Sequence, residues 1–507
     1  MKKLCLLVPC LLAALACNFP GWSARGGLPV DLLRQTLAAQ SPPLPEQTPL
    51  PTAAVTTQLS QPVPQVTQAP YPQAMGGLYA YITRSGDTLP ALAGRFGVEP
   101  GQISLPPGIS PDGYLPPGTV LTIPAVLPQV AAGGLLLPDA ELVYSPTALA
   151  FDLEASIRIA GGYLDSYREL VDGEAHTGAA IIRRVALELS VNPRLLLALL
   201  EYRAGWVYGQ PPSTQDRLHP LGLNIPGRSG LYQEIHIAAT QLNLAYYGWR
   251  QGAFGELKFR SQVRLRPDPS LNAGSVAVQH LFALLYPQEA WLPALYGPQG
   301  FLALYQRLYG DPWSRAEAMG ALLPQDLSQP FLELPFLPGE RLSLTAGPHP
   351  AWNAGTPRAA LDFSPVTGEA VCAISRAWAT ASASGVVARA EHNAVALDLD
   401  GDGSEATGWV LVYLHLAQVD LVPAGSAVAQ DEPLGHPSCE GGRATGKHVH
   451  LARKYNGEWL PADGPLPFVL SGWRAVAEAA NYQGSLVKGD QAVFSNASGR
   501  RTSIIVR

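Results

Sequence analysis

The amino-acid sequence predicts a multidomain protein with a small α/β module, a mainly α-helical middle domain and an all-β antiparallel C-terminal domain. Its 507 residues exceed what one hydrophobic core usually serves. Short strand-like and helical runs give way to helical periodicity at residue 147, and to short apolar segments with frequent Gly after residue 335. The 48 Pro and 50 Gly indicate linkers and many turns.

An export signal is expected at residues 1–16, where two Lys precede an apolar run that is too short to span a membrane. The run closes on Ala14-Leu15-Ala16-Cys17, which resembles a bacterial lipobox. The resemblance implies a lipid on Cys17 that anchors an exported lipoprotein in the bacterial cell envelope, facing the wall. An ordinary cleaved signal with an incidental Cys is the alternative.

Residues 17–74 are rich in Pro, Gln, Thr and Ala, which predicts a disordered linker. The formal net charge is -6, and there is no dense run of Lys or Arg outside the extreme N-terminus. Nucleic acid is therefore not an expected partner.

Residues 75–126 contain Gly86-Asp87-Thr88, which leads a strand into a capped helix, and Phe96-Gly97-Val98, which ends that helix. The segment resembles a lysin-motif (LysM) domain, a strand-helix-helix-strand module that binds the glycan of peptidoglycan. Residues 127–146 are expected to form a second linker.

Residues 147–330 are expected to be helical, with Asn192-Pro193 as one helix start. The stretch Val191–Glu201 is similar to the catalytic-helix region of lysozyme-like lytic transglycosylases. That similarity implies a glycosidic acid/base role for Glu201. The alternative is a solvated or salt-bridged Glu at a helix end.

Four short segments after residue 335 carry a candidate zinc site. They are Gly347-Pro348-His349-Pro350, Ala360-Leu361-Asp362-Phe363, Val412-Tyr413-Leu414-His415-Leu416 and Thr445-Gly446-Lys447-His448-Val449-His450-Leu451. A hydrolytic zinc site needs three nitrogen or oxygen ligands and one open position, and His349, Asp362 and His450 can supply the three ligands. His448 and His450 are two residues apart, so their imidazoles point to the same side of a strand. One can bind metal while the other handles protons.

The same alternation predicts two unlike faces for the strand around Tyr413. Tyr413 and His415 are expected on a polar working face. Val412, Leu414 and Leu416 are expected on the opposite, buried face.

These segments resemble the lysostaphin-type zinc endopeptidases, and within them the branch of staphylolysin and the beta-lytic proteases. In the commoner branch the first ligand His stands four residues before the Asp, where this chain has Arg358. In the beta-lytic branch that His stands further upstream in a Gly-Gly-x-His-like turn, which Ala346-Gly347-Pro348-His349 matches.

The resemblance implies one zinc ion per chain, held by His349, Asp362 and His450. It gives His448 the role of general base and His415 that of stabilising the transition state. The peptidase domain is expected at residues 336–473, with residues 474–507 as a C-terminal extension packing on it.

Asp398, Asp400 and Asp402 alternate with Leu and Gly like the opening of a calcium loop. The twelfth position is Trp409 instead of a bidentate Glu, and Glu405 is a further candidate ligand. The reading that we favour is a hairpin turn between strands at residues 395–397 and 410–414.

Cys372 and Cys439 remain after the three N-terminal Cys are set aside, and in an exported protein they are expected to form a disulfide. Two separate buried thiols are the alternative.

The sequence therefore predicts an envelope-tethered zinc endopeptidase that hydrolyses peptide bonds in the stem peptides or cross-bridges of peptidoglycan. One alternative is a non-catalytic peptidoglycan-binding or regulatory protein with a degenerate peptidase domain. Another is a lytic transglycosylase that acts through Glu201.

Overall fold

The computed structural model describes residues 77–499 and 501–507, which belong to one compact unit. The expected signal, Cys17 and the Pro-rich linker lie outside the described residues. In the part of the chain that the structure describes, none of the helices has the length and apolar character needed to cross a membrane.

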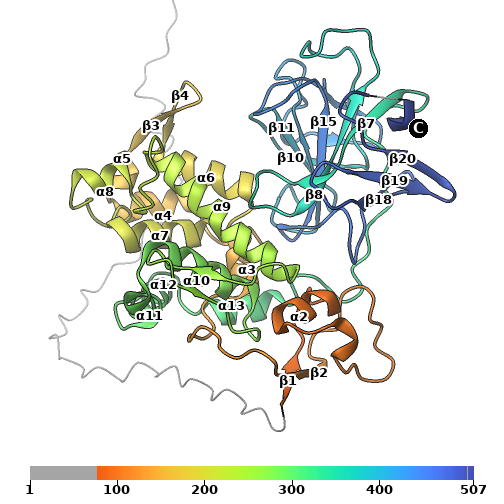
Figure 1. The fold of residues 1–507 in the computed structure, drawn as a ribbon. Helices are drawn as coiled ribbons and strands as arrows, with labels where there is room; N and C mark the ends of the chain where they lie inside the picture. The colour runs from red at the N-terminus through yellow and green to blue at the C-terminus, as the bar shows by residue number, and fades with distance from the viewer. Residues whose placement is uncertain (1–76, 500) are drawn as a thin grey trace, which may run out of the picture. The chain divides into compact units, whose positions relative to one another are not determined.

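The N-terminal module pairs two antiparallel strands, β1 (Leu78–Ile82) and β2 (Val120–Pro124), as Figure 1 shows. Between them in sequence lie α2 (Leu89–Phe96) and the 3-10 turn η1 (Pro100–Gln102). The Thr88 side chain caps α2 by accepting a hydrogen bond from the Ala91 N–H group. The expected second helix is only this 3-10 turn, because Ile103 is already extended and Ser104 forms a β-bridge with Thr122.

The middle of the chain is helical, as expected (Figure 1). Its α-helices are α3 (Asp139–Leu142), α4 (Leu153–Ala160), α5 (Tyr163–Ser166), α6 (Gly178–Leu189), α7 (Pro193–Ala204), α8 (Thr214–Leu218), α9 (Leu231–Arg250), α10 (Ala273–Leu285), α11 (Gln288–Tyr296), α12 (Phe301–Tyr309) and α13 (Pro312–Met319). The smaller elements are η2 (Pro146–Ala148) and the hairpins β3 (Arg168–Val171) with β4 (Glu174–Thr177), and β5 (Leu257–Lys258) with β6 (Arg264–Leu265). Helix α7 begins at the expected place, where the Asn192 side chain accepts a hydrogen bond from the Arg194 N–H group.

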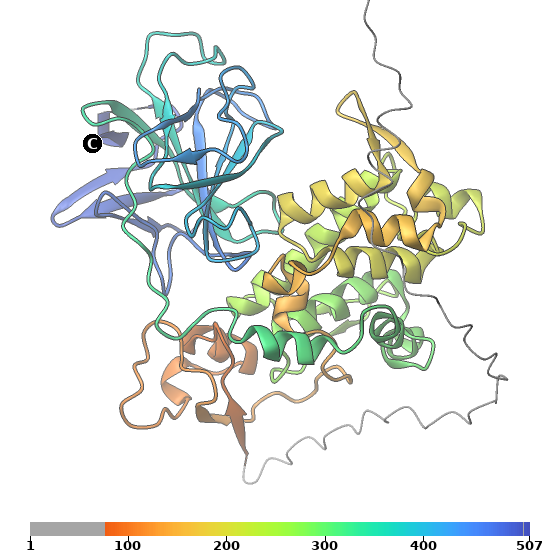
Figure 2. The ribbon, with the colours of Figure 1, turned by 180° about the vertical axis from the view of Figure 1, so that it is seen from behind.

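The C-terminal part, cyan to blue in Figure 2, consists of strands. Its main sheet is antiparallel, as expected, with strand order β13-β10-β11-β12-β15-β8-β7-β21. Its strands are β7 (Arg341–Pro350), β8 (Arg358–Pro365), β10 (Gly385–Glu391), β11 (Ala394–Asp398), β12 (Trp409–Leu414), β13 (Ala427–Val428), β15 (Val449–Tyr455) and β21 (Ile504–Val506), and β16 (Glu458–Trp459) pairs with β15. Two smaller sheets consist of β9 (Ala379–Thr380) with β14 (Pro433–Gly435), and of β17 (Val469–Leu470), β18 (Trp473–Ala477), β19 (Gly484–Lys488) and β20 (Gln491–Phe494). The 3-10 turn η3 (Arg501–Ser503) precedes β21, which pairs with β7, so the C-terminal extension adds an edge strand to the main sheet.

The two faces of the main sheet are buried against different partners. One face carries Leu361 and Tyr413 into a core within the β part. The other face carries Ala360, Val412 and Ala452 into the core of the helical region. The helices therefore cover one face of the sheet.

The prediction that Tyr413 lies on a polar working face of β12 is wrong. Its ring is buried, and its hydroxyl accepts a hydrogen bond from the Ser382 N–H group at 2.8 Å. Leu414 lies directly opposite His450 in the ladder, so it shares the face of His450. His415 has a φ of 63°, and this left-handed turn after the strand breaks the alternation and brings its ring near His450.

Backbone segments of the helical region and the β part approach closely. A Cβ atom at Gly355 would lie 2.4 Å from the Thr240 carbonyl oxygen, and one at Gly457 would lie 2.0 Å from that of Tyr144. The Ser190 hydroxyl also donates a hydrogen bond to the Gly457 carbonyl at 2.6 Å. Glycine is therefore required at both contacts.

The buried guanidinium of Arg250, at the end of α9, contacts all three parts of the described chain. It donates hydrogen bonds of 2.8 and 2.6 Å to the Glu458 carboxylate, and another to the Ser85 carbonyl. The Asp139 carboxylate lies 3.7 Å away. This one side chain joins the N-terminal module, the helical region and the sheet.

Candidate metal centre

Three neighbouring strands place His349, Asp362 and His450 side by side. Asp362 on β8 lies directly opposite His450 on β15. Ala346 on β7 pairs with Asp362, whereas His349 pairs with Ala360, so β7 has one extra residue at this point. This bulge changes the direction of the β7 backbone, as bulges commonly do. It brings the His349 ring close to Asp362.

Gly347 lies within the bulge. A Cβ atom there would lie 2.6 Å from the Gly484 nitrogen and 2.8 Å from the Gln483 carbonyl carbon. These are backbone atoms that cannot move aside easily. The Gly of the motif is therefore explained by packing of β7 against the loop between β18 and β19.

The side chains bring three potential ligand atoms together. His349 Nε2 and His450 Nδ1 are 3.0 Å apart, and each lies 3.2 Å from Asp362 Oδ1. Tetrahedral zinc with bonds of about 2.0–2.1 Å separates its ligand atoms by roughly 3.3 Å. The spacing of the three atoms fits such an ion.

The outer hydrogen bonds show which atoms face this point with lone pairs. His349 Nδ1 donates to the Gly347 carbonyl at 2.9 Å, and His450 Nε2 donates to the Ala351 carbonyl at 2.8 Å. In the neutral imidazoles the inner nitrogens are then acceptors, so their short approach is no hydrogen bond. Asp362 Oδ1 is buried without a hydrogen-bond partner. Three converging acceptors of this kind fit a cation.

His415 and His448 lie beside this group. His448 Nε2 is 3.6 Å from Asp362 Oδ2, and the ring centroids of His415 and His448 are 4.4 Å apart. Each His donates its Nδ1 proton to a backbone carbonyl at 2.8 Å, that of Glu440 for His415 and that of Gly446 for His448. Nε2 is thus the nitrogen available to a ligand on both.

Burial and neighbouring charges shift the pKa values of the site residues in different directions. Burial, and then the nearby His448, lowers the pKa of His415 to about 4, so His415 is neutral at pH 7. Burial also lowers the pKa of His450. Burial alone would raise the pKa of Asp362, but His349 and His448 hold it well below its usual range. Against the effect of burial, Asp362 raises the pKa of His349.

Tyr482 is a site residue that the sequence did not reveal. Its ring stacks on His349 with centroids 4.7 Å apart and planes 25° from parallel. It lies between β18 and β19, in the extension that was expected only to pack on the domain. No local pattern marks it, because its proximity to His349 arises from the fold.

The cluster of His349, Asp362 and His450 opens into a cleft of about 1680 Å³. The β part lines it with the cluster, His415, His448 and Tyr482. The helical region adds residues of the β3–β4 hairpin, of α6 and of α9, among them Asp172, Glu188 and Tyr232. A ligand in this cleft can contact both regions.

Other candidate residues lie elsewhere. The Arg358 guanidinium donates to the Glu478 carbonyl at 2.7 Å, away from the three candidate ligands. Glu201 Oε2 accepts hydrogen bonds from the Val207 and Tyr208 N–H groups at 2.9 and 3.0 Å, so the carboxylate holds the loop after α7.

The Asp-rich segment forms the expected hairpin turn between β11 and β12. Carboxylate oxygens of Asp398, Asp400 and Asp402 lie within 4.8 Å of one another. Burial and the neighbouring Asp398 raise the pKa of Asp400 to about 6. Glu405, considered as a further ligand, instead binds Arg389 and Lys454.

Cys372 and Cys439 form a disulfide, which confirms that expectation. Cys17 lies outside the described residues.

Comparisons with known proteins find a family model and several similar proteins. The family model described as "LasA, N-terminal domain" matches residues 135–323. Protease LasA of Pseudomonas aeruginosa is 27% identical over 359 residues, which cover 67% of this chain and 77% of that protein. Beta-lytic metalloendopeptidase of Achromobacter lyticus is 30% identical over 112 residues, or 21% of this chain and 27% of that protein. The solved structure of the M23 metalloprotease pseudoalterin from the deep sea is 20% identical with a TM-score of 0.30, covering 36% of this chain and all of that one.

Proposed function

We propose that this chain, a LasA-like relative of the M23-family metallopeptidases, is a zinc endopeptidase that hydrolyses peptide bonds in the stem peptides or cross-bridges of peptidoglycan. The observation that carries the proposal is the convergence of three acceptor atoms, at 3.0–3.2 Å from one another, on the wall of a large cleft. Peptide is the substrate class because the relatives are named as peptidases and proteases.

His349, Asp362 and His450 are the residues that would hold zinc. Bound zinc supplies Lewis-acid chemistry, by polarising a substrate carbonyl and acidifying water. The carbonyls of Gly347 and Ala351 orient the two imidazoles through their outer nitrogens.

His448 is proposed as the general base. Its Nε2 lies beside Asp362, and its Nδ1 proton is fixed on the Gly446 carbonyl, so Nε2 can accept the proton of the attacking water. A protonated His448 can then return the proton to the leaving amine.

His415 is proposed to stabilise the oxyanion. Either a protonated imidazole or a neutral one with a proton on Nε2 can donate to the developing negative charge. With Nδ1 donating to Glu440, donation from Nε2 requires the imidazolium, which the negative charge of the transition state favours.

The remaining parts are proposed to hold the enzyme at an insoluble substrate. Residues 75–126 would bind glycan as a LysM-like module, and a lipid on Cys17 with the linker 17–74 would tether the chain to the envelope. Such tethering raises the local concentration of enzyme at its substrate.

The transglycosylase role of Glu201 and the calcium site at the Asp-rich loop have less support than the zinc site. Both hydrogen bonds of the Glu201 carboxylate go to backbone groups, which supports a structural role over glycosidic catalysis. Both oxygens of Asp398 accept backbone N–H groups of its own turn, from Asp400 and Gly403, so calcium at this loop stays a prediction.

Product analysis on purified peptidoglycan tests the proposal. The protein is expected to release new free amino groups, to lose this activity after chelation, and to regain it with about one zinc per chain. His450→Ala serves as the inactive control and Glu201→Gln as the active one. Anhydro-sugar ends that disappear with Glu201→Gln would instead indicate a transglycosylase, and no product at all would indicate a binding protein.

A further inference from the structure

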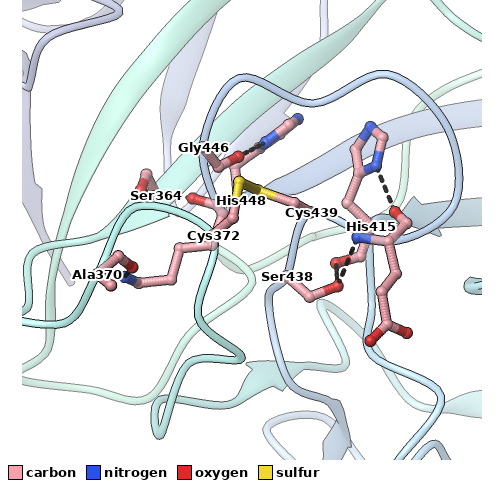
Figure 3. Close-up of a disulfide and its surroundings, with 10 residues drawn as sticks. Ser364, Ala370, Cys372, His415, Ser438, Cys439, Gly446 and His448 are labelled. Atoms are coloured by element: carbon pink, nitrogen blue, oxygen red, sulfur yellow. Dashed lines mark hydrogen bonds between the residues drawn. A yellow bond between two sulfur atoms is a disulfide. The ribbon is translucent and has the colours of Figure 1, made fainter. Parts of the chain in front are cut away.

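The Cys372–Cys439 disulfide connects two irregular segments near His415 and His448 (Figure 3). The Cys372 segment (residues 366–378) follows β8. The Cys439 segment (residues 439–447) precedes β15 and His448, which forms an isolated β-bridge with Ser438. Neither segment contains a helix or strand. Their positions therefore depend on individual contacts and on the covalent link.

Residues next to Cys439 hold His415. The Ser438 N–H group and hydroxyl donate to the His415 carbonyl at 2.7 and 3.0 Å. The Glu440 carbonyl accepts the Nδ1 proton of the same residue at 2.8 Å. Backbone and ring of His415 are thus both fixed by the immediate neighbours of Cys439.

Residues next to Cys372 hold the chain at His448. The Val371 carbonyl accepts the Lys447 N–H group at 2.8 Å, and the Ala370 carbonyl accepts the Lys447 ammonium at 2.7 Å. The His448 N–H group itself donates to the Ser438 carbonyl at 3.3 Å. The disulfide therefore lies between the contacts that fix His415 and those that fix His448.

The metal ligands are held differently. Asp362 and His450 are paired within the β8–β15 ladder, and His349 is on β7 of the same sheet. None of these three strands needs the disulfide for its hydrogen bonds. The ligand set thus rests on the sheet. His448 is held by the Cys372 segment and also by β8, where the Ser364 hydroxyl donates to the Lys447 carbonyl at 2.7 Å, and His415 is held by the residues next to Cys439.

We propose that the Cys372–Cys439 disulfide is a positioning element that sets His415 against His448 and leaves zinc binding to the sheet. The inference rests on the proposed peptidase function. Without the link, the two segments would gain conformations, and misplacement of a reacting group by about 1 Å can cost on the order of a hundredfold in rate. Turnover is the quantity that should fall.

The test is the double variant Cys372→Ala/Cys439→Ala, assayed for zinc content and for the kinetics of amine release. Zinc is expected to stay near one per chain, kcat to fall at least tenfold, and KM to change less than about threefold. Val493→Ala, a cavity variant in β20, is the matched control: its thermal stability should fall while kcat stays unchanged.

A second measurement covers a double variant that fails to fold. The wild-type protein, reduced with a phosphine under native conditions, should lose turnover while keeping its zinc, and reoxidation should restore turnover. An active wild type whose kcat survives reduction, or a reduced form that loses its zinc, would overturn the inference. A wild type that releases no amine would instead refute the proposed function.

Discussion

His448 and His450 are two positions apart and both lie near Asp362, yet they should respond differently to mutation. His450→Ala is expected to lose the metal, because it removes one of three ligands. His448→Ala is expected to keep zinc and to lower turnover by roughly a hundredfold or more, the scale of a lost general base. His415→Ala should behave like His448→Ala.

Zinc stoichiometry measured beside the rate of amine release separates these roles. Loss of zinc in His448→Ala would make that residue a ligand. Full activity in His448→Ala would refute the proposed mechanism.

Short motifs predict much of the candidate metal centre. His349, Asp362, His448 and His450 stand in such motifs, and the structure brings them together. The assignment of Tyr413 to the working face failed because alternation assumes an unbroken strand. Residue spacing does not encode the left-handed φ of His415. The sequence therefore could not show that His415 and Tyr413 lie on different faces.

At the scale of single elements, the bulge in β7 is the feature that makes His349 a candidate ligand. Gly347→Ala should displace this bulge, because the new Cβ atom would meet backbone atoms of the β18–β19 loop at 2.6 Å. We expect at least a tenfold loss of zinc affinity together with a lower melting temperature. Competition with a chromogenic chelator measures the affinity.

Gly368→Ala is the matched control for this substitution. Gly368 is exposed in the same β part, and a Cβ atom there would have no neighbour within 4 Å. Equal zinc affinity in both variants would show that the bulge tolerates a side chain and does not set the ligand.

Sequence patterns predict helix starts and turns better than they predict bulges within strands. The turn between β11 and β12 followed from its Asp and Gly residues, and the start of α7 from Asn192 and Pro193. The bulge in β7 depends on contacts with the β18–β19 loop, more than a hundred residues later in the chain. Such distant contacts leave no periodic signal.

A buried charge cluster links β10, β15 and the β11–β12 connection. Burial alone would raise the pKa of Glu405, but Arg389 and Lys454 lower it to about 2. Its contribution to stability should therefore be complete above pH 4.5, the ordinary pKa of a Glu, and should be lost as the pH falls towards 2. Urea midpoints at pH 5 and pH 3 measure this loss.

Glu405→Gln should destabilise the protein at pH 7 by about 3–5 kcal/mol, because it leaves two buried cations without a carboxylate. The variant should also lose less stability than wild type between pH 5 and pH 3. The exposed Glu154→Gln is the control. An unchanged pH dependence in Glu405→Gln would assign the acid sensitivity to other groups.

At the scale of the whole molecule, the helical region covers the sheet face that also bears the candidate metal ligands. Residues 336–507 expressed alone should expose the apolar side chains of this face, including Val410, Val412 and Trp459. We expect a lower melting temperature and binding of a hydrophobic dye. Co-expression with residues 77–330 should reverse both effects, and a fragment as stable as the full chain would contradict this view of the interface.

The sequence predicts a series of domains, but its patterns do not show which side chains of the helical region and of the sheet pack together. The small residues Ala360, Ala396 and Ala452 look like ordinary strand positions, and nothing local shows that helices pack on them. The similarity of Val191–Glu201 to lytic transglycosylases offers a glycosidic role for Glu201 as an alternative, and that role stays a prediction. The family model described as the N-terminal domain of LasA matches residues 135–323, which include this stretch.

Arg250 has a consequence for the order in which the chain can fold. A ribosome delivers α9 long before Glu458, which is 208 positions later, and Trp459 joins the same core as the helices. Until those residues arrive, the helices lack part of their packing surface and Arg250 lacks its carboxylate. Contacts of such long sequence separation slow folding. The last-made third of the chain therefore completes the fold of the middle third, and premature termination of synthesis would leave helices with an uncovered apolar face.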